Sequence, residues 1–173
     1  MHDTTKTGRR MLGALVAAGM ATGLLATGAA ATPSPRGAGL LSDLQPATEE
    51  PTDGARARVR TQERDGSTRV ALRLRGLDPA AAGNRYGAHI HVGPCVAGNG
   101  ALAGPHYNVG GGVSDETEVW LDFTIEADGT ANAETRVPFT IAPGTAQSLV
   151  IHAQPTDATG AAGARMACLP VEF

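Results

Sequence analysis

The most regular feature of this sequence is an alternation of apolar and polar residues that begins near residue 55. In one segment Val70, Leu72 and Leu74 alternate with arginines, and similar patterns recur further along the chain. A period of two residues is typical of β-strands that bury one face. Beyond the first 31 residues, no segment keeps the 3.6-residue period of an amphipathic helix. The pattern predicts strands at 55–62, 69–75, 85–92, 119–126, 130–138, 148–152 and 165–173.

Turn signals separate these strands and indicate the fold class. Asp65-Gly66 predicts a tight hairpin between the first two strands. Ala127-Asp128-Gly129 predicts a turn, after which residues 130–138 return as a partner strand. Short strands separated by regular turn signals are typical of antiparallel sandwiches and barrels. We therefore expect an all-β protein.

The first 31 residues have the composition of a signal peptide. Lys6, Arg9 and Arg10 precede an apolar run that starts at Met11, and three alanines at 29–31 suit signal peptidase. The run is also long enough for an uncleaved membrane anchor. The small residues and the prolines that follow favour cleavage, so we expect a secreted or extracytoplasmic protein. Retention near the membrane is left open.

Residues 32–54 differ in composition from the rest of the chain. They are rich in proline, glycine, alanine, threonine and acidic residues. This composition predicts a linker or a loosely ordered arm. The folded domain is then expected at residues 55–173.

The charge of the mature chain argues against nucleic-acid binding. Removing the leader, with Lys6, Arg9, Arg10 and Asp3, leaves 11 basic and 16 acidic residues and a net charge of −5. Apart from arginines that alternate along the predicted strands, no basic cluster is visible in the sequence. We therefore expect no nucleic-acid partner.

The two cysteines, Cys95 and Cys168, favour a disulfide. An exported chain passes into an oxidising compartment, where paired cysteines are usually bridged. Two free buried thiols are the alternative.

Four of the five histidines lie in settings that suit a metal site. His89 and His91 are one residue apart in a predicted strand, so their side chains share a face. His106 lies in a glycine-rich loop, and His152 ends a predicted strand. Neutral imidazoles suit copper, zinc, nickel and iron, and an all-nitrogen set favours Cu(II). The sequence therefore predicts a nitrogen-rich metal site, although each histidine taken singly is more often a structural residue.

Residues 84–173 resemble the copper,zinc superoxide dismutases, and residues 55–76 fit that family's early strands less specifically. The matching motifs are Gly87-Ala88-His89-Ile90-His91, Cys95, Ala103-Gly104-Pro105-His106-Tyr107-Asn108, Leu149-Val150-Ile151-His152 and Gly163-Ala164-Arg165-Met166-Ala167-Cys168. The family's first strand has no clear counterpart. It either begins at Leu40 and Leu41 or is missing.

The resemblance implies a fold and a set of site residues. The fold is a Greek-key antiparallel β-barrel or sandwich, with a Cys95–Cys168 disulfide. Copper would be bound by His89, His91, His106 and His152. Arg165 would lie beside the open face of the copper and guide superoxide. In the zinc-containing enzymes the residue at the position of His106 also carries a proton, so Arg165 and His106 are the expected catalytic residues.

The loop after His106 departs from the family pattern. In the family this histidine bridges copper and zinc, and the following loop adds two histidines and an aspartate as zinc ligands. Residues 107–118 contain no histidine, whereas a closed zinc site needs four ligands. We therefore expect a copper-only member without zinc. A metal-bound imidazole normally has an acceptor on its far nitrogen, and the candidates for His106 are Glu116 or Glu118, with Asp115 and Asp122 less favoured.

The loop between His152 and Arg165 is the second departure. It has twelve residues, shorter than usual in the family, and its only charge is Asp157. We expect a more open copper channel and weaker electrostatic focusing on an anionic substrate, which leaves Arg165 as nearly the only local cation.

Together these features predict an exported copper-dependent superoxide dismutase. It would convert superoxide to oxygen and hydrogen peroxide by cycling between Cu(II) and Cu(I), and a homodimer is left open. The alternative is a non-enzymatic copper buffer or delivery protein on the same barrel, and a relative that has lost its metal is a third.

Overall fold

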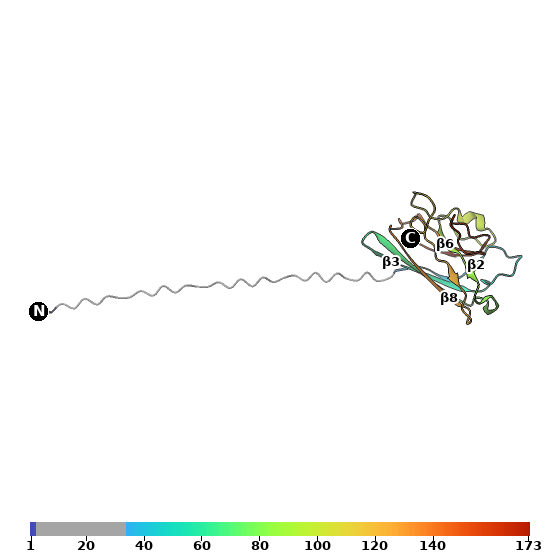
Figure 1. The fold of residues 1–173 in the computed structure, drawn as a ribbon, viewed down its shortest axis with the longest axis horizontal. Coiled ribbons are helices and arrows are strands. Elements are labelled where there is room, and N and C mark those ends of the chain that lie inside the picture. The colour runs from blue at the N-terminus through green and yellow to red at the C-terminus, as the bar shows by residue number, and fades with distance from the viewer. Residues whose placement is uncertain (3–33) are drawn as a thin grey trace. The chain divides into compact units, whose positions relative to one another are not determined.

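The domain consists of two four-stranded antiparallel sheets and a short two-stranded one (Figure 1). The computed structural model describes residues 1–2 and 34–173, so the expected signal peptide, apart from its first two residues, lies outside the described residues. The first sheet has the order β1 (Ser34–Leu40), β3 (Arg56–Arg64), β4 (Ser67–Arg75), β8 (Thr130–Val137). The second has the order β2 (Ser42–Asp43), β10 (Arg165–Pro170), β9 (Ser148–His152), β6 (Ala88–His91). The third pairs β5 (Arg85–Tyr86) with β7 (Phe123–Thr124).

In the described part of the chain, the helical content is limited to two short 3₁₀ turns, η1 (Pro79–Ala81) and η2 (Gly100–Ala103). Within residues 34–173, none of the helices has the length and apolar character needed to cross a membrane.

The hairpin of β3 and β4 confirms the turn predicted at Asp65-Gly66. The two strands pair without interruption from Arg56 with Arg75 to Arg64 with Ser67. Asp65 and Gly66 have φ values of 51° and 75°. Two consecutive residues with positive φ form the type of turn whose twist matches that of the flanking strands, and glycine adopts such angles without strain.

The prediction for residues 130–138 was correct for the strand and wrong for its partner. β8 pairs with β4 over eight positions, from Thr68 with Val137 to Arg75 with Thr130. The preceding segment alternates in burial from Val119 to Ile125, but it forms only the two-residue strand β7. The free edge of β4 offers a much longer ladder than β7 does. This is the physical reason for the different pairing.

Residues 32–54 contain two strands where the sequence predicted a linker or a loosely ordered arm. β1 pairs with β3 and begins at Ser34, several residues before Leu40, while β2 pairs with β10. The family's first strand is therefore present. The composition misled the prediction because β1 needs small residues: a Cβ on Gly37 would lie 2.4 Å from the carbonyl oxygen of Pro170.

The course of the chain is that of a Greek-key sandwich, which confirms the expected fold class. The chain leaves the first sheet after β4, enters the second at β6, returns to the first at β8 and crosses again to β9. Apolar side chains from both sheets fill the space between them, among them Val59, Leu72, Ile90, Leu121 and Ile151. Burial of each large aliphatic side chain stabilises the fold by about 1.5–3 kcal/mol.

Cys95 and Cys168 form a disulfide, as predicted. Their Cα atoms are 5.6 Å apart, and the bridge joins the loop after β6 to β10 across 73 positions of sequence. In the chain-entropy account, a loop of this size stabilises the folded state by about 4–5 kcal/mol.

Candidate metal centre

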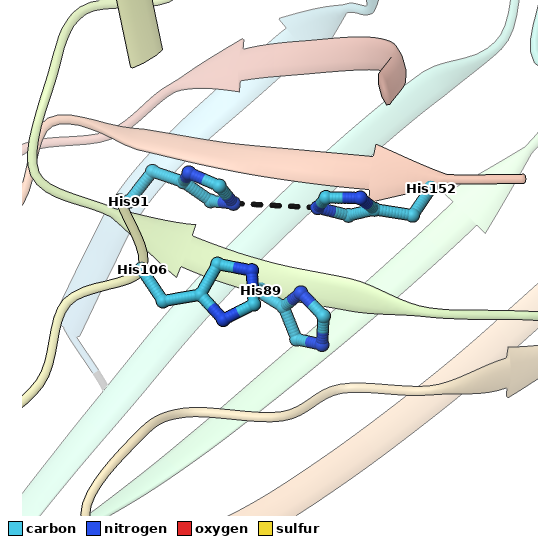
Figure 2. Close-up of side chains that lie close together, drawn as sticks. All are labelled: His89, His91, His106 and His152. Carbon is cyan, nitrogen blue, oxygen red and sulfur yellow. Dashed lines mark hydrogen bonds between the residues drawn. The ribbon is translucent and has the colours of Figure 1, made fainter. Parts of the chain in front are cut away.

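The four predicted histidines converge on one point. One ring nitrogen from each of His89, His91, His106 and His152 lies within 4.8 Å of the corresponding nitrogens of the other three. Figure 2 shows the rings grouped together, with His91 and His152 facing each other. The Nε2 atoms of that pair are 3.3 Å apart. Among residues 34–173 this is the only group of potential metal ligands of its kind.

Strand β6 provides two of the ligands because of its alternation. Ala88 and Ile90 point into the core, so His89 and His91 point to the other face of the same strand. The neighbouring strand β9 ends at His152. The loop that follows β6 carries His106, and a single β-bridge between His91 and His106 attaches it to that strand. Three segments far apart in sequence therefore meet at one strand.

Gly87, immediately before β6, permits a close approach of the loop after β9. A Cβ at this position would lie 2.7 Å from the Cβ of Ala162 and 3.0 Å from the hydroxyl oxygen of Thr156. The loop can therefore cover the end of the histidine strand only if residue 87 has no side chain.

Three of the imidazoles are fixed by hydrogen bonds from Nδ1. His91 donates to the carbonyl oxygen of Gly104 at 3.0 Å, and His152 donates to that of Gly163 at 3.2 Å. His106 donates to the carboxylate of Glu118 at 2.8 Å. With the proton on Nδ1, each ring presents the lone pair of Nε2 to the cluster.

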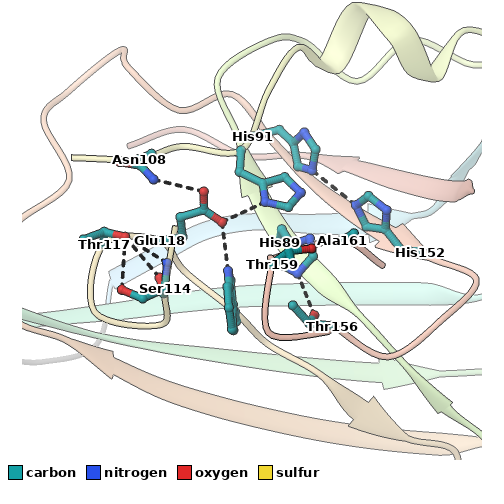
Figure 3. A network of polar contacts seen from close by, with 12 residues as sticks. His89, His91, Asn108, Ser114, Thr117, Glu118, His152, Thr156, Thr159 and Ala161 are labelled. Atoms are coloured by element: carbon teal, nitrogen blue, oxygen red, sulfur yellow. Dashed lines mark hydrogen bonds and ion pairs between the residues drawn. The ribbon is translucent and has the colours of Figure 1, made fainter. Parts of the chain in front are cut away.

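His89 is fixed in the opposite sense, through Thr156 and Asp122, and Figure 3 shows the contact of its ring with Thr156. The hydroxyl of Thr156 donates to the carboxylate of Asp122, so its oxygen must accept from Nε2 of His89, at 2.7 Å. The lone pair of His89 then lies on Nδ1. This atom is buried and has no hydrogen-bond partner. A buried, unpartnered nitrogen beside three other lone pairs is what a metal-binding site requires, so the donor set fits a metal ion.

Burial keeps these rings neutral. Desolvation by burial, followed by electrostatic interactions with the other three histidines and with Arg165, lowers the pKa of His89 to about 2. Desolvation also lowers the pKa of His91 to about 3 and that of His152 to about 4. Because a metal binds only unprotonated imidazole, protons do not compete for these three nitrogens near neutral pH.

Of the four acids considered as partners of His106, the structure brings Glu118 to it. Glu118 is buried, and its carboxylate also accepts from the indole nitrogen of Trp120 at 2.9 Å and from the side-chain amide of Asn108 at 3.0 Å. Glu116, the other favoured candidate, is exposed, and so is Asp115. Asp122 bonds Thr156 instead.

The carboxylate of Glu118 is held in its charged form. Burial by itself would raise its pKa, but the hydrogen bonds from Trp120, Asn108 and His106 outweigh that effect and lower the pKa below its usual value. A buried acid with three donors therefore lies on the far side of His106 from the other histidines.

Arg165 is anchored next to the cluster by two backbone carbonyl groups. Its guanidinium donates to the carbonyl oxygens of Gly100 and Gly104, each at 2.7 Å. The oxygen of Gly104 also accepts from His91, so the cation and one imidazole share an acceptor. Its positive charge contributes to the lowered pKa values of His89, His91 and His152.

The comparison with known proteins agrees with this geometry. Residues 55–169 match the family model for copper/zinc superoxide dismutase, which covers most of the chain. The chain belongs to the copper/zinc superoxide dismutase family. A crystal structure of a double mutant of a SOD-like protein from Bacillus subtilis is similar, with a TM-score of 0.59 and 19% sequence identity. The alignment covers 79% of this chain and 97% of the Bacillus protein, and it supports the shared fold.

Several residues of this candidate metal centre could not be predicted from the sequence. Thr156 lies in a loop whose sequence gives no signal of a role, and the sequence around Trp120 gives no signal that its indole bonds an acid of the site. Asn108 was only part of a matching motif. Their functions depend on what lies beside them in space, which the sequence does not show.

Proposed function

We propose that this protein is a copper-dependent superoxide dismutase that works without zinc. The observation that carries the proposal is the cluster of four oriented imidazoles beside Arg165. Nδ1 of His89 and Nε2 of His91, His106 and His152 would hold the copper. Bound copper would supply the one-electron couple by which one superoxide is oxidised to oxygen and a second is reduced to peroxide.

Arg165 would attract and orient the superoxide anion. Two carbonyl oxygens hold the guanidinium in place, so it does not have to be ordered when the anion arrives. The loop from 153 to 164 carries only Asp157 as a charged residue, which leaves Arg165 as the main source of attraction.

His106, with Glu118 as its partner, would deliver a proton to the peroxide product. Glu118 keeps the proton on Nδ1 of His106, so Nε2, whenever it is not bound to copper, is the atom that can take up and release another. When both ring nitrogens carry protons, the charged ring is stabilised by the adjacent carboxylate of Glu118.

The position of the Glu118 carboxylate supports the proposal that the protein works without zinc. Nδ1 of His106, the nitrogen that a bridging ligand would turn to a second metal, is already bonded to Glu118. The segment 107–118 contains no histidine that could complete such a site. We therefore propose that Glu118 replaces zinc as the partner of His106.

Metal loading followed by an activity measurement tests this function. The purified metal-free domain is offered equimolar Cu(II) and Zn(II), dialysed and analysed for both metals, and superoxide decay is then followed by stopped flow. We expect one copper, no zinc and rapid decay. Bound copper without superoxide removal would make the protein a copper buffer or delivery protein, and stoichiometric zinc would contradict the role of Glu118.

Export belongs to the same proposal. The composition of residues 1–31 and the disulfide of the domain support an oxidising, extracytoplasmic location. Fractionation of cells that express the full chain, with N-terminal sequencing of the product, tests it. Intact protein in the cytoplasmic fraction would contradict it.

A further inference from the structure

Six arginines form a stripe on the outer face of the first sheet. The arginine stripe consists of Arg56, Arg58 and Arg60 on β3 and Arg69, Arg73 and Arg75 on β4. All six side chains are exposed. The strand register places Arg56 opposite Arg75 and Arg58 opposite Arg73. A shallow groove runs along the stripe, lined also by the small residues Ala38 and Ala71.

Most of the stripe is not neutralised by the protein. Of its six arginines, only Arg69 forms an ion pair within residues 34–173, with Glu134. The other five arginines form no ion pair and no side-chain hydrogen bond in that part of the chain. The chain after residue 31 has a net charge of −5, so acidic residues are abundant elsewhere. Positive charge is therefore concentrated on one face of an acidic protein.

Folding does not account for this arrangement. Like charges directly opposite each other on neighbouring strands destabilise a sheet. Charges that protect a sheet from edge-to-edge aggregation belong on edge strands, whereas β3 and β4 are the two central strands. A concentrated field of one sign favours an oppositely charged ligand.

We propose that the arginine stripe binds a linear polysaccharide carrying sulfate or phosphate groups along β3 and β4. Guanidinium groups bind such oxyanions through paired hydrogen bonds. Outward-facing residues on one strand are about 7 Å apart, so the stripe offers a row of regularly spaced sites.

The shape of the charged area favours a linear ligand over a flat one. Around Arg56, Arg58, Arg73 and Arg75 the charged area is two strands wide. Uncharged residues flank it there: Ala38 and Leu40 on β1, and Thr130 and Asn132 on β8. At the other end, Arg136 on β8 lies opposite Arg69. An anionic membrane would match a broad disc of charge better than a line. A second copy of the chain placed face to face would bring arginines against arginines.

The stripe is independent of the metal centre. Its side chains leave the outer face of the first sheet, while His89 and His91 leave the outer face of the second. The two sites therefore lie on opposite faces of the sandwich, and binding of a polyanion can be tested apart from superoxide removal.

The test measures binding of the metal-loaded protein to labelled dextran sulfate at several salt concentrations around 0.1 M. Wild-type protein is compared with Arg58→Gln, Arg73→Gln and the double variant. We expect the double variant to bind at least tenfold more weakly. The slope of log affinity against log salt should fall by about one for each arginine removed.

Arg64→Gln is the matched control. It removes the same charge from an exposed position of β3, but six residues from Arg58, about 20 Å along the strand. That separation is about twice the screening length of 10 Å at 0.1 M salt. We expect its affinity to stay within twofold of wild type. Circular dichroism and thermal unfolding confirm that each variant is folded.

Three results would overturn the proposal. Equal weakening by Arg64→Gln and Arg58→Gln would show a dependence on net charge alone. Binding to phosphatidylglycerol vesicles without binding to dextran sulfate would identify a membrane as the partner. Binding only to a single-stranded oligonucleotide would identify a nucleic acid and would also contradict the expectation from composition.

Discussion

At the scale of single residues, each imidazole of the cluster is oriented by one acceptor outside it. Backbone carbonyl groups accept the hydrogen bonds of His91 and His152, while side chains accept those of His106 and His89. Since a ring with one nitrogen protonated and bonded can present only the other, these acceptors decide which atoms face the metal.

Replacing Thr156 by valine tests the least expected of these contacts. The change removes the acceptor of Nε2 of His89, so the ring loses its fixed tautomer. We expect copper affinity to fall by about 10–100-fold, measured by competition with a chelator. Thr159→Val in the same loop is the control, since its hydroxyl bonds only Asp157. Equal affinities of the two variants would argue against the role of Thr156.

The two glutamates favoured by the sequence can be separated by matched substitutions. Glu118→Gln removes the charge beside His106, and Glu116→Gln removes one from an exposed position. We expect Glu118→Gln to retain copper and to remove superoxide about 100-fold more slowly, at the lower end of a general acid–base contribution. Glu116→Gln should match wild type in stopped-flow decay. Similar rates for all three proteins would contradict the proposed proton relay.

Arg165→Ala should keep the copper and slow superoxide removal by about tenfold, because electrostatic steering raises association rates by that factor or more. Added salt should slow the wild-type protein more than the variant. Arg64→Ala, at the tip of the β3–β4 hairpin, is the control. An unchanged rate constant for Arg165→Ala would contradict the proposed role of Arg165 in guiding superoxide.

At the scale of elements, β1 links the two sheets. It pairs with β3, while the backbone nitrogen of Glu172, after β10, donates to the carbonyl oxygen of Arg36 at 2.8 Å. Small residues let the strand approach the second sheet closely, which explains both its position and its unremarkable sequence.

Two glycines of β1 provide a matched test of this contact. A Cβ on Gly37 would meet the carbonyl oxygen of Pro170 at 2.4 Å, whereas one on Gly39 would meet only a methyl group of Leu169 at 3.8 Å. We expect Gly37→Ala to lower the free energy of unfolding by about 1–3 kcal/mol. Gly39→Ala should be near neutral in urea titrations. Equal effects would show that β1 is not tightly packed.

At the scale of the whole molecule, the metal-free protein carries three buried neutral histidines that unfolding exposes. Their lowered pKa values mean that the unfolded chain binds protons below about pH 6.5, while the folded chain does not until far lower pH. Stability is therefore greatest above pH 6.5 and falls on acidification.

Urea unfolding of the metal-free protein at several pH values measures this effect. Each of the three groups contributes a slope of about 1.4 kcal/mol per pH unit below pH 6.5. His152→Asn should reduce the total slope by one such contribution. A free energy of unfolding that stays constant between pH 7 and pH 5 would contradict the assignment of neutral buried rings.

Much of the architecture is determined by local sequence. The alternation of apolar and polar residues predicted the strands of the β3–β4 hairpin and of β6. Successive side chains of a strand point to opposite faces, so a strand with one buried face needs apolar residues at every second position. The chemistry of His89, His91, His106, His152, Cys95 and Cys168 followed from residue types in short motifs, and the structure brings these residues together.

Only the tertiary structure decided which neighbours these residues have. The sequence favours Glu116 and Glu118 equally as the partner of His106. In the structure Glu118 is buried next to His106, whereas Glu116 is exposed. Thr156 and Asp122 are 34 positions apart and meet through the packing of a loop on a strand. The arginines of β3 and β4 alternate as in any half-exposed strand, but the register makes them one stripe. Contacts between distant segments depend on the path of the whole chain, which no local pattern encodes.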